Sequence, residues 1–436
     1  MLFNSTLKTY TYISLAVFIG LLTYVYINVP NIPTADEWEL SYFVEKIYNK
    51  SFVISDLMVP HNECRMPYPH IIHLIILFIT RWHSFSLIAF NLTLLLVFYF
   101  TLRKYTFESL NPKRINAFGV SFILILLVIF SLKQYENIVL SFDLNYYLSV
   151  IAGLWSFISL KKISWKSITV SMIWAHISLY SYASGFTIWP FLILLIWIIS
   201  EEGNKAKVIY SLVVATVFVC NIALYFYNYH PLANAEAEKS TNPVELIPYA
   251  LTFLSNNFVT TGSTAIKLTI VQLIVIVSAI WVLFKTDKVK ALQLSPIFAY
   301  GFWAISIGFM VAHGRASLGI MHALSPRYCT LSFPFAICSI ISLIIHIEYI
   351  GYWIKIKVIN RYVTLQTYML VAIFGVQQVR YLKAANLRNN NLAEAVKHIK
   401  ASDFDAPIVK EMLYNRSDIL KIKVDMMKKH RLSLYR

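Results

Sequence analysis

Charged residues are scarce in this chain. Only 14% of its 436 residues are Asp, Glu, Lys or Arg, whereas 58% are hydrophobic and the mean hydropathy is +0.61. That balance excludes an ordinary soluble domain, in which about a quarter of the residues are charged. The formal net charge of +16 resides mostly in short loops between apolar runs and in the last 56 residues. We therefore interpret it as a signal of membrane orientation and predict no nucleic-acid partner.

Glycine-rich nucleotide-binding loops and cysteine motifs are also missing. The twelve glycines are dispersed, and neither a P-loop nor a Rossmann-type turn occurs. This argues against ATP-driven transport and against use of a soluble nucleotide sugar. Cys64, Cys220, Cys329 and Cys338 have the spacing of neither a disulfide framework nor a metal site. We predict no cofactor, and the pattern offers no support for a divalent metal.

Long apolar runs dominate what is present. Runs of this length can cross a bilayer core of roughly 30 Å, and backbone groups in lipid must be satisfied within helices. We predict an all-α, polytopic transmembrane helical bundle of about eleven spans and expect the first run to be a retained helix. The spans lie near residues 10–29, 85–102, 115–132, 144–160, 167–182, 186–200, 208–227, 268–284, 292–311, 328–347 and 363–379. The shorter apolar run 71–79 is predicted to be an interfacial helix.

The distribution of Lys and Arg sets the predicted orientation. These residues gather in alternate short loops, which places those loops and the amino terminus in the cytoplasm. The transmembrane domain, residues 1–380, then has outer loops at 30–70 and 228–267. Residues 381–436 contain twelve Lys or Arg and six Asp or Glu, and are predicted to form a small helical outer domain.

The outer stretch 35–65 concentrates ionisable groups between apolar spans. It contains the acids Asp36, Glu37, Glu39 and Glu63, together with His61 and Arg65. Ionisable groups in such positions usually face a cavity or a partner, which predicts a site at a membrane surface. Two alternatives stay open: a solvated loop whose acids cap short helices, and a local ion pair between Glu63 and Arg65.

Other polar residues belong to the same predicted face. They are Gln134, Glu136, Asn137, Asp143, Arg315 and Arg327. A carboxylate can accept a proton from a hydroxyl nucleophile, and an arginine can neutralise a phosphate leaving group. Since the site would open beside lipid, the phosphate is predicted to belong to a lipid carrier.

Several short motifs follow each other along nearly the whole chain. They are Ala35-Asp36-Glu37-Trp38, His61-Asn62-Glu63-Cys64-Arg65, Gln134-Tyr135-Glu136-Asn137, Tyr182-Ala183-Ser184-Gly185, Trp189-Pro190, Gly314-Arg315, Ala323-Leu324-Ser325-Pro326-Arg327-Tyr328 and Leu432-Ser433-Leu434-Tyr435-Arg436. Their order resembles that of the GT-C-type membrane glycosyltransferases. Among these, the chain looks most like the bacterial and phage glucosyltransferases that modify O-antigen and convert serotype. Cys64 stands where the second motif of that group commonly has His, and Pro326 replaces a small polar residue.

The resemblance implies an activity. It is the inverting transfer of a hexose, with glucose preferred, from undecaprenyl phosphate to O-antigen or a similar polysaccharide. The active site would face the periplasm from the bacterial inner membrane. A polyprenyl-phosphate-linked sugar donor, a lipid-linked polysaccharide acceptor, a carrier-loading glycosyltransferase and a flippase are the implied partners.

The resemblance also assigns residue roles. Asp36 would be the base or would bind the acceptor hydroxyl, and Glu37 or Glu63 would orient Asp36 or the acceptor sugar. Arg315 or Arg327 would hold the carrier phosphate. The remaining predicted substrate-binding residues are Arg65, Gln134, Asn137 and Tyr328.

Two other functions fit parts of the pattern. An O-antigen polymerase or ligase is also polytopic with arginines in outer loops, but it would need no early Asp-Glu pair. A lipid-linked sugar flippase or other transporter would favour charged residues at mid-membrane depth and paired broken helices, and the sequence has little of either.

Overall fold

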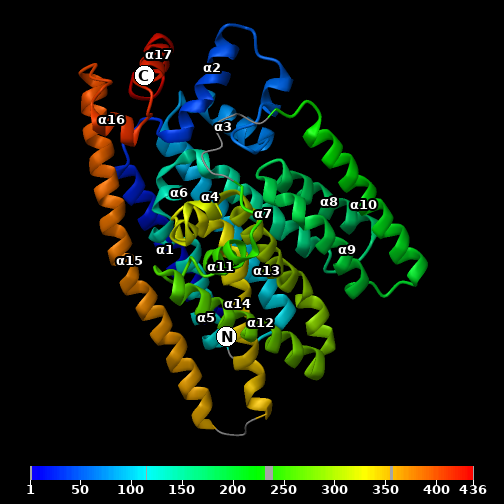
Figure 1. The fold of residues 1–436 in the computed structure, drawn as a ribbon. Coiled ribbons are helices and arrows are strands. Elements are labelled where there is room, and N and C mark those ends of the chain that lie inside the picture. Colours follow the sequence, from blue (N-terminus) through cyan, green and yellow to red (C-terminus); the bar gives the residue numbers. More distant parts are fainter. Residues whose placement is uncertain (1, 114, 231–238, 354–356, 436) are drawn as a thin grey trace.

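Every secondary-structure element that the structure describes is a helix, which confirms the predicted all-α class. The computed structural model describes the backbone of residues 2–113, 115–230, 239–353 and 357–435 (Figure 1). The α-helices are α1 (Leu2–Asn28), α2 (Leu40–Tyr48), α3 (Pro67–Thr80), α4 (Ser84–Leu110), α5 (Ile115–Ile129), α6 (Tyr135–Val139), α7 (Leu144–Ser159), α8 (Trp165–Leu179), α9 (Ile188–Ile199), α10 (Asn204–Phe226), α11 (Pro243–Leu254), α12 (Gly262–Thr286), α13 (Lys288–Arg315), α14 (Tyr328–Trp353), α15 (Lys357–Lys400), α16 (Pro407–Met412) and α17 (Ser417–His430). The 3-10 helices are η1 (Ala35–Glu39), η2 (Ile54–Met58), η3 (Leu132–Gln134), η4 (Ser141–Asp143), η5 (Ala183–Thr187), η6 (Ala316–Leu318), η7 (Ile320–Leu324) and η8 (Ser433–Tyr435).

Seven helical segments of the described chain are long and apolar enough to cross a bilayer. They comprise α1, α4, the stretch from α5 to α6, α10, α12, α13 and α14. The protein is therefore a membrane-embedded helical bundle. Three further predicted spans form the shorter helices α7, α8 and α9, of 16, 15 and 12 residues. The last predicted span, 363–379, belongs to α15, and its side chains up to residue 373 lie outside the described residues.

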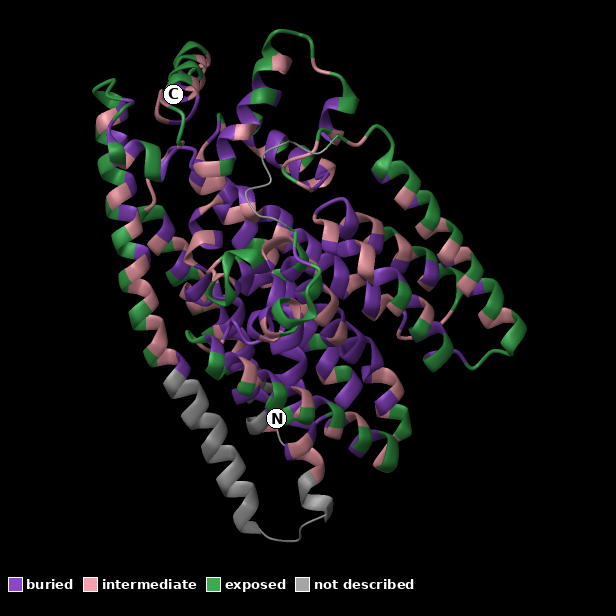
Figure 2. Ribbon diagram, in the orientation of Figure 1, coloured by how far each residue is buried: buried purple, intermediate pink, exposed green. Residues whose placement is uncertain are grey.

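The centre of the bundle is formed by α13 and α14, which pack against each other and against α7, α11 and α12. Buried residues concentrate there, whereas the outer helices expose one side (Figure 2). Gly301 lets the two central helices approach closely, because a Cβ at this position would overlap Cys338 of α14. Small residues at helix interfaces are the usual means of close packing in membranes.

Serine side chains hold α7 against α8. Ser149 Oγ lies 3.0 Å from Ser178 Oγ, and Ser156 Oγ donates to the Ser171 carbonyl at 2.9 Å. Small hydroxyl residues allow close contact and also satisfy their own polar groups across the interface. The two helices thus form a tight pair on one side of the bundle.

The predicted polar loop at 228–267 contains a buried helix, α11. Asn242 caps it by accepting the Val244 N–H at 3.0 Å, and Pro243 occupies the first turn. Tyr249 and Phe253 are four residues apart and buried against the bundle. The flanking Asn and Pro residues indicated a loop, but this apolar spacing produces a helix once α13 is available as a packing surface.

Two segments lie at the same end of the molecule, opposite the amino terminus (Figure 1). We call residues 30–80, which contain the first predicted outer loop, the first outer segment, and residues 407–435 the carboxyl-terminal segment. The short helices η1, α2 and α3 from the first segment meet α16 and α17 from the second, and the two segments share one apolar cluster. We call this the shared end. The candidate site lies here.

Candidate active site

The helix η1 presents two adjacent carboxylates to opposite surroundings. The Asp36 side chain is 56% exposed, whereas Glu37 is only 1% exposed. Ala35, which begins η1, has a φ of 46°, a left-handed conformation that is uncommon for a residue with a Cβ. The chain therefore turns sharply at Ala35, immediately before Asp36.

Asp36 is open to solvent and lies beside His61. Its Oδ2 is 3.6 Å from His61 Nε2. Burial by the surrounding protein raises the pKa of Asp36, but the polar contact and charge of His61, with the charge of Arg327, outweigh burial and leave the pKa below its ordinary value. The carboxylate is consequently ionised at neutral pH and accessible, as a proton acceptor for a substrate hydroxyl must be.

Glu37 is held in the interior of the shared end. Its Oε1 accepts a hydrogen bond of 2.9 Å from Trp82 Nε1. Burial raises the pKa of Glu37 to about 7, although the Trp82 hydrogen bond acts in the opposite direction. The predicted role of Glu37 in orienting Asp36 or the acceptor stays a prediction, because its described contacts are with the protein.

Glu63 lies on a tight turn closed by reciprocal backbone hydrogen bonds of 2.8 and 2.9 Å between His61 and Cys64. The turn directs Glu63 toward Arg315 at the end of α13. Glu63 Oε1 is 3.5 Å from Arg315 Nη2, and both side chains are partly exposed. Two predicted site residues from distant parts of the chain therefore meet here.

Arg65 binds the end of α10. Its Nη2 donates to the Asn228 carbonyl at 2.8 Å, its backbone N–H donates to Tyr225 Oη at 2.9 Å, and the side chain is buried. A cation at a helix carboxyl terminus also complements the helix dipole. The described contacts of Arg65 thus anchor the 61–65 turn to α10. Its predicted role in substrate binding stays a prediction.

Arg327 directly precedes α14, and buried polar side chains form a hydrogen-bond network with its backbone. Its Nε is 3.3 Å from Glu136 Oε2, and half of its side chain is exposed. Asn137 Nδ2 donates to the Arg327 carbonyl at 2.9 Å and to Thr330 Oγ1 at 2.7 Å. Thr330 Oγ1 in turn donates to Gln134 Oε1 at 2.7 Å. Gln134 and Asn137 are buried, so their contacts position the backbone of Arg327.

Tyr328 follows Arg327 and is almost fully buried. Its ring centroid lies 5.6 Å from that of His322 and 6.0 Å from that of Phe253. His322 Nδ1 is in turn 3.0 Å from Tyr249 Oη. This aromatic packing fixes the first turn of α14 beside the exposed guanidinium.

Two charged residues at the site were not assigned a role from the sequence. Asp143, at the end of η4, has a buried Oδ2 without a hydrogen-bond partner among the described residues. Burial raises the pKa of Asp143 to about 7, with the charges of Arg327 and Arg388 opposing it. Arg388 comes from α15, and its buried Nε has no hydrogen-bond partner in the described part of the chain either. The apolar patterning placed Asp143 on the outer face, but nothing in the sequence indicated that α15 brings Arg388 to it.

The described residues contain no group of three or more His, Cys, Asp or Glu side chains that could hold a metal ion. His70 and His73, on α3, are buried, and burial lowers their pKa values to about 3 and 4. His73 Nε2 lies 2.9 Å from the Ser141 carbonyl. Both histidines are therefore neutral structural residues at neutral pH.

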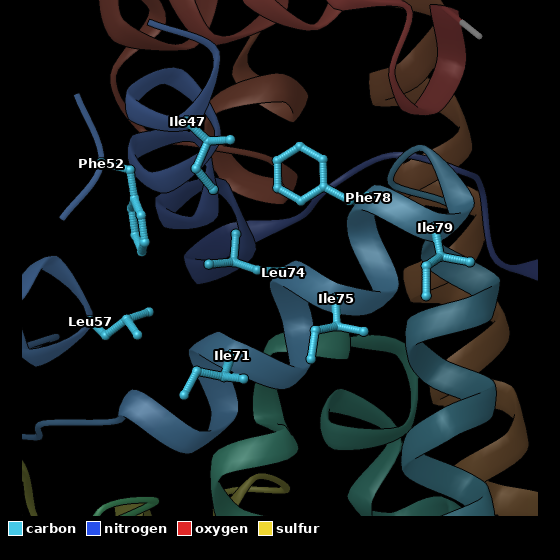
Figure 3. Close-up of a pocket in the computed structure, with 8 residues that line it drawn as sticks. All are labelled: Ile47, Phe52, Leu57, Ile71, Leu74, Ile75, Phe78 and Ile79. Carbon is cyan, nitrogen blue, oxygen red and sulfur yellow. The ribbon is translucent and has the colours of Figure 1, made fainter. Parts of the chain in front are cut away.

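An open apolar groove of about 480 Å³ lies between α2 and α3 (Figure 3). The opposite face of α3 contacts the candidate site, since His73 stacks on Phe142 with ring centroids 5.8 Å apart. The helix α3 thus separates the groove from η4. The groove is lined by Ile47, Phe52, Leu57, Ile71, Leu74, Ile75, Phe78 and Ile79.

Four predicted residues from three parts of the chain meet at the shared end. Asp36 is within electrostatic reach of Arg327, and Glu63 pairs with Arg315. No family model and no curated protein matches the chain. The likeness to GT-C transferases therefore stays an interpretation of the motifs.

Proposed function

We propose that the chain is an inverting, GT-C-type membrane glycosyltransferase. It would transfer a hexose, glucose by preference, from undecaprenyl phosphate to O-antigen or a similar surface polysaccharide. One observation carries the proposal: the ionised, accessible carboxylate of Asp36 shares one end of an apolar bundle with the guanidinium groups of Arg315 and Arg327. Transfer from a phosphate-linked donor requires both kinds of group in one site.

In the proposed reaction, Asp36 accepts the proton of the acceptor hydroxyl while the hydroxyl oxygen forms a bond to the anomeric carbon. The bond between that carbon and the phosphate oxygen breaks, and the carrier leaves as a phosphate monoester. Arg315 and Arg327 neutralise the charge that develops on the phosphate. Each already contacts a glutamate, but a guanidinium has five N–H donors and both side chains are partly exposed. A phosphate can therefore be added to the existing pairs.

The apolar groove supports a lipid-linked donor. Its Phe78 and Ile79 end is next to the turn that joins α3 to the apolar helix α4. The groove therefore begins where a candidate membrane span begins. We propose that it accepts part of the isoprenoid chain of the donor.

The membrane arrangement follows the same proposal. The seven long apolar helices, the shorter α7, α8 and α9, and the first part of α15 would make eleven spans of a GT-C bundle in the bacterial inner membrane. The shared end would then face the periplasm, where a lipid-linked polysaccharide acceptor is available. A carrier-loading glycosyltransferase and a flippase would supply the donor on that face.

The proposal can be tested with purified protein in liposomes that contain a radiolabelled polyprenyl-phosphate hexose and a lipid-linked acceptor glycan. We expect Asp36→Asn to lower the transfer rate by about 10²–10⁴-fold, the usual contribution of a general base. Arg327→Ala should also lower it strongly. Asp418→Asn, which changes an exposed acid on α17, should leave the rate unchanged.

Two outcomes would contradict the proposal. Full transfer by both Asp36→Asn and Arg327→Ala would remove the assigned site and favour a polymerase or ligase. Movement of label across the liposome membrane without a new glycosidic bond would identify a transporter.

A further inference from the structure

The carboxyl-terminal segment, residues 407–435, makes polar contacts with the helix that carries Asp36. The Ala35 N–H donates to the Leu413 carbonyl at 2.9 Å. Tyr414 Oη donates to Glu39 Oε1 at 2.9 Å. Leu413 and Tyr414 thus contact the two ends of η1, and Lys423 contacts it as well.

Lys423 binds η1 through two acceptors. Its Nζ donates to the Trp38 carbonyl at 3.0 Å and to Glu39 Oε1 at 3.4 Å. The same ammonium group lies 4.5 Å from the ring centroid of Tyr414. Only 14% of the Lys423 side chain is exposed, so these contacts are shielded from solvent. Shielding strengthens a charged hydrogen bond relative to one at the surface.

A second pair of contacts holds the chain just before η1. Ser433 Oγ donates to the Asn31 carbonyl at 2.9 Å, and the Ser433 N–H donates to the Arg81 carbonyl at 2.9 Å. Asn31 Oδ1 also accepts the Ser84 N–H at 2.9 Å. The carboxyl-terminal segment is thus attached on both sides of Asp36.

Apolar packing reinforces the attachment. Trp38, on η1, is completely buried in the same cluster as Val409, Leu420 and Val424 of the carboxyl-terminal segment. The same cluster also contains Trp82, whose Nε1 donates a hydrogen bond to Glu37. Residues from the far end of the chain therefore supply part of the surroundings of η1.

The backbone of η1 requires such support. The left-handed conformation of Ala35 costs a residue with a Cβ of the order of 1–2 kcal/mol and persists only when neighbouring structure enforces it. The Leu413 carbonyl binds the Ala35 N–H itself. This contact fixes the turn from which the Asp36 side chain emerges.

We infer that the carboxyl-terminal segment is a positioning element of the site, in which Leu413, Tyr414 and Lys423 hold η1 in the conformation that presents Asp36 toward Arg327. The expected effect on sugar transfer rests on the proposed function. The dependence of the η1 conformation on these contacts is a structural statement and is independent of that function.

The test compares Lys423→Met, Tyr414→Phe and Lys423→Arg in the full-length protein in nanodiscs. Methionine keeps an apolar stem of similar length but removes the ammonium group and both of its hydrogen bonds, whereas arginine keeps a charged donor. The first measurement is hydrogen exchange of the peptide that covers residues 34–40, which includes the Ala35 amide. We expect exchange in this peptide to be about tenfold faster in Lys423→Met and less affected in Tyr414→Phe.

The second measurement separates kcat from KM in the transfer assay. A displaced Asp36 slows proton removal without changing the arginines, so kcat should fall about tenfold in Lys423→Met while the KM for the donor changes less than twofold. Lys423→Arg should restore most of kcat. The matched control is Lys421→Met, on the exposed face of the same helix, which should change neither measurement.

The outcomes are distinguishable. Unchanged exchange of residues 34–40 and unchanged kcat in Lys423→Met would overturn the inference, as would an equal loss in Lys421→Met. If no variant and no wild-type protein transfers sugar, the proposed function fails. Faster exchange in Lys423→Met alone would then still support the structural contact.

Discussion

Asp36 and Glu37 are neighbours in sequence, but their acidities are shifted in opposite directions. Burial raises the pKa of both, yet only Asp36 has a positively charged neighbour, Arg327, and a contact with His61 that overcome it. The hydrogen-bond partners of Glu37, Trp82 Nε1 first among them, are neutral, so burial prevails and leaves the pKa of Glu37 at about 7. At neutral pH Asp36 is therefore the ionised base of the pair, and Glu37 is near the midpoint of its titration.

The raised pKa of Glu37 predicts a pH-dependent stability. The group binds its proton more tightly in the folded state than in the unfolded state, where its pKa is near 4.5. The stabilisation from this proton is complete below about pH 4.5 and is lost as the pH rises through about 7. At 1.36 kcal/mol per pKa unit, the free energy of unfolding should fall by about 3 kcal/mol over that interval. Glu37→Gln, which keeps an acceptor for Trp82, should remove this dependence.

Thermal unfolding in detergent at pH 5 and pH 8 measures the effect. The difference in Tm between the two pH values should be clearly smaller in Glu37→Gln than in the wild-type protein. Glu411→Gln, at an exposed position on α16, is the control and should leave the difference as it is. An unchanged pH dependence in Glu37→Gln would show that another group causes it.

For individual residues, the sequence indicated which charged groups belong to the site but not which groups they contact. Asp36, Glu63, Arg315 and Arg327 could be predicted because acids and arginines between apolar runs are costly unless they have partners. The anchoring contacts of Arg65 with α10 could not, since the acceptors are backbone carbonyls, which every sequence offers equally. Arg388 was missed for a related reason, because many basic residues surround it in the last 56 residues.

The helix α3 serves two environments with its two faces. Its buried face carries His70, His73 and Leu77, and its other face forms the floor of the apolar groove. Ile71, Ile75 and Ile79 follow each other at intervals of four, which places them on one side of the helix. At 14 residues α3 is too short to cross a bilayer. Its exposed isoleucines are suited to contact with a lipid chain.

The groove therefore predicts the effect of a charge on donor binding. Ile75→Glu places a carboxylate in an apolar lining, and an isoprenoid chain would have to desolvate it. We expect the KM for the donor to rise about tenfold, which corresponds to about 1.4 kcal/mol. The kcat at saturating donor should change little, because Ile75 contacts neither Asp36 nor the arginines.

Ile54→Glu provides the matched comparison. Ile54 is 81% exposed and lies close to the groove in η2 without lining it. The same carboxylate at Ile54 should leave the donor KM within twofold of the wild-type value. An equal rise in both variants would indicate a general effect of charge on membrane association, and the groove would lose its assigned role.

The helices that contain long apolar runs could be predicted from the sequence. The helices that depend on packing against other helices could not. Seven long segments confirm the bilayer-length signal. The helix α11 was predicted to be part of a polar loop that contains Pro243 and Pro248, whereas Pro243 occupies its first turn and Pro248 is tolerated within it. The helices α7, α8 and α9 are shorter than a full span, and their packing, of α7 and α9 against α13 and of α8 against α7, is a tertiary property.

The two largest apolar cores of the described chain differ in origin. The larger core lies within the bundle, and the smaller one lies at the shared end, between the first outer segment, α3 and the carboxyl-terminal segment. The sequence predicted residues 381–436 to be a small outer domain. The shared core was not predictable, because Lys423 and its acceptor Trp38 are 385 positions apart and no local periodicity reports such a contact.

The shared core predicts the result of a truncation after Lys400. Removal of Val409, Leu420, Val424 and Met427, all fully buried, forfeits roughly 6–12 kcal/mol of apolar burial at 1.5–3 kcal/mol each. That loss is comparable to the total stability of a typical domain. We expect α2 to unfold, so trypsin should cleave at Lys46 at least tenfold faster than in the full-length protein. Cleavage at Lys205, in the first turn of the helix α10 elsewhere in the bundle, is the internal control.

Two results would contradict this expectation. Equal protection of Lys46 in the truncated and full-length proteins would mean that the first outer segment folds on its own. Faster cleavage at both lysines would indicate general unfolding of the bundle.

The hydrogen bond between Lys423 and Trp38 also imposes an order on biogenesis. Trp38 leaves the ribosome first, and its partner is translated 385 positions later. At about 5–20 residues per second, the interval is roughly 20–80 s. During that time η1 lacks this contact, so its final conformation is supported only after Lys423 has been synthesised.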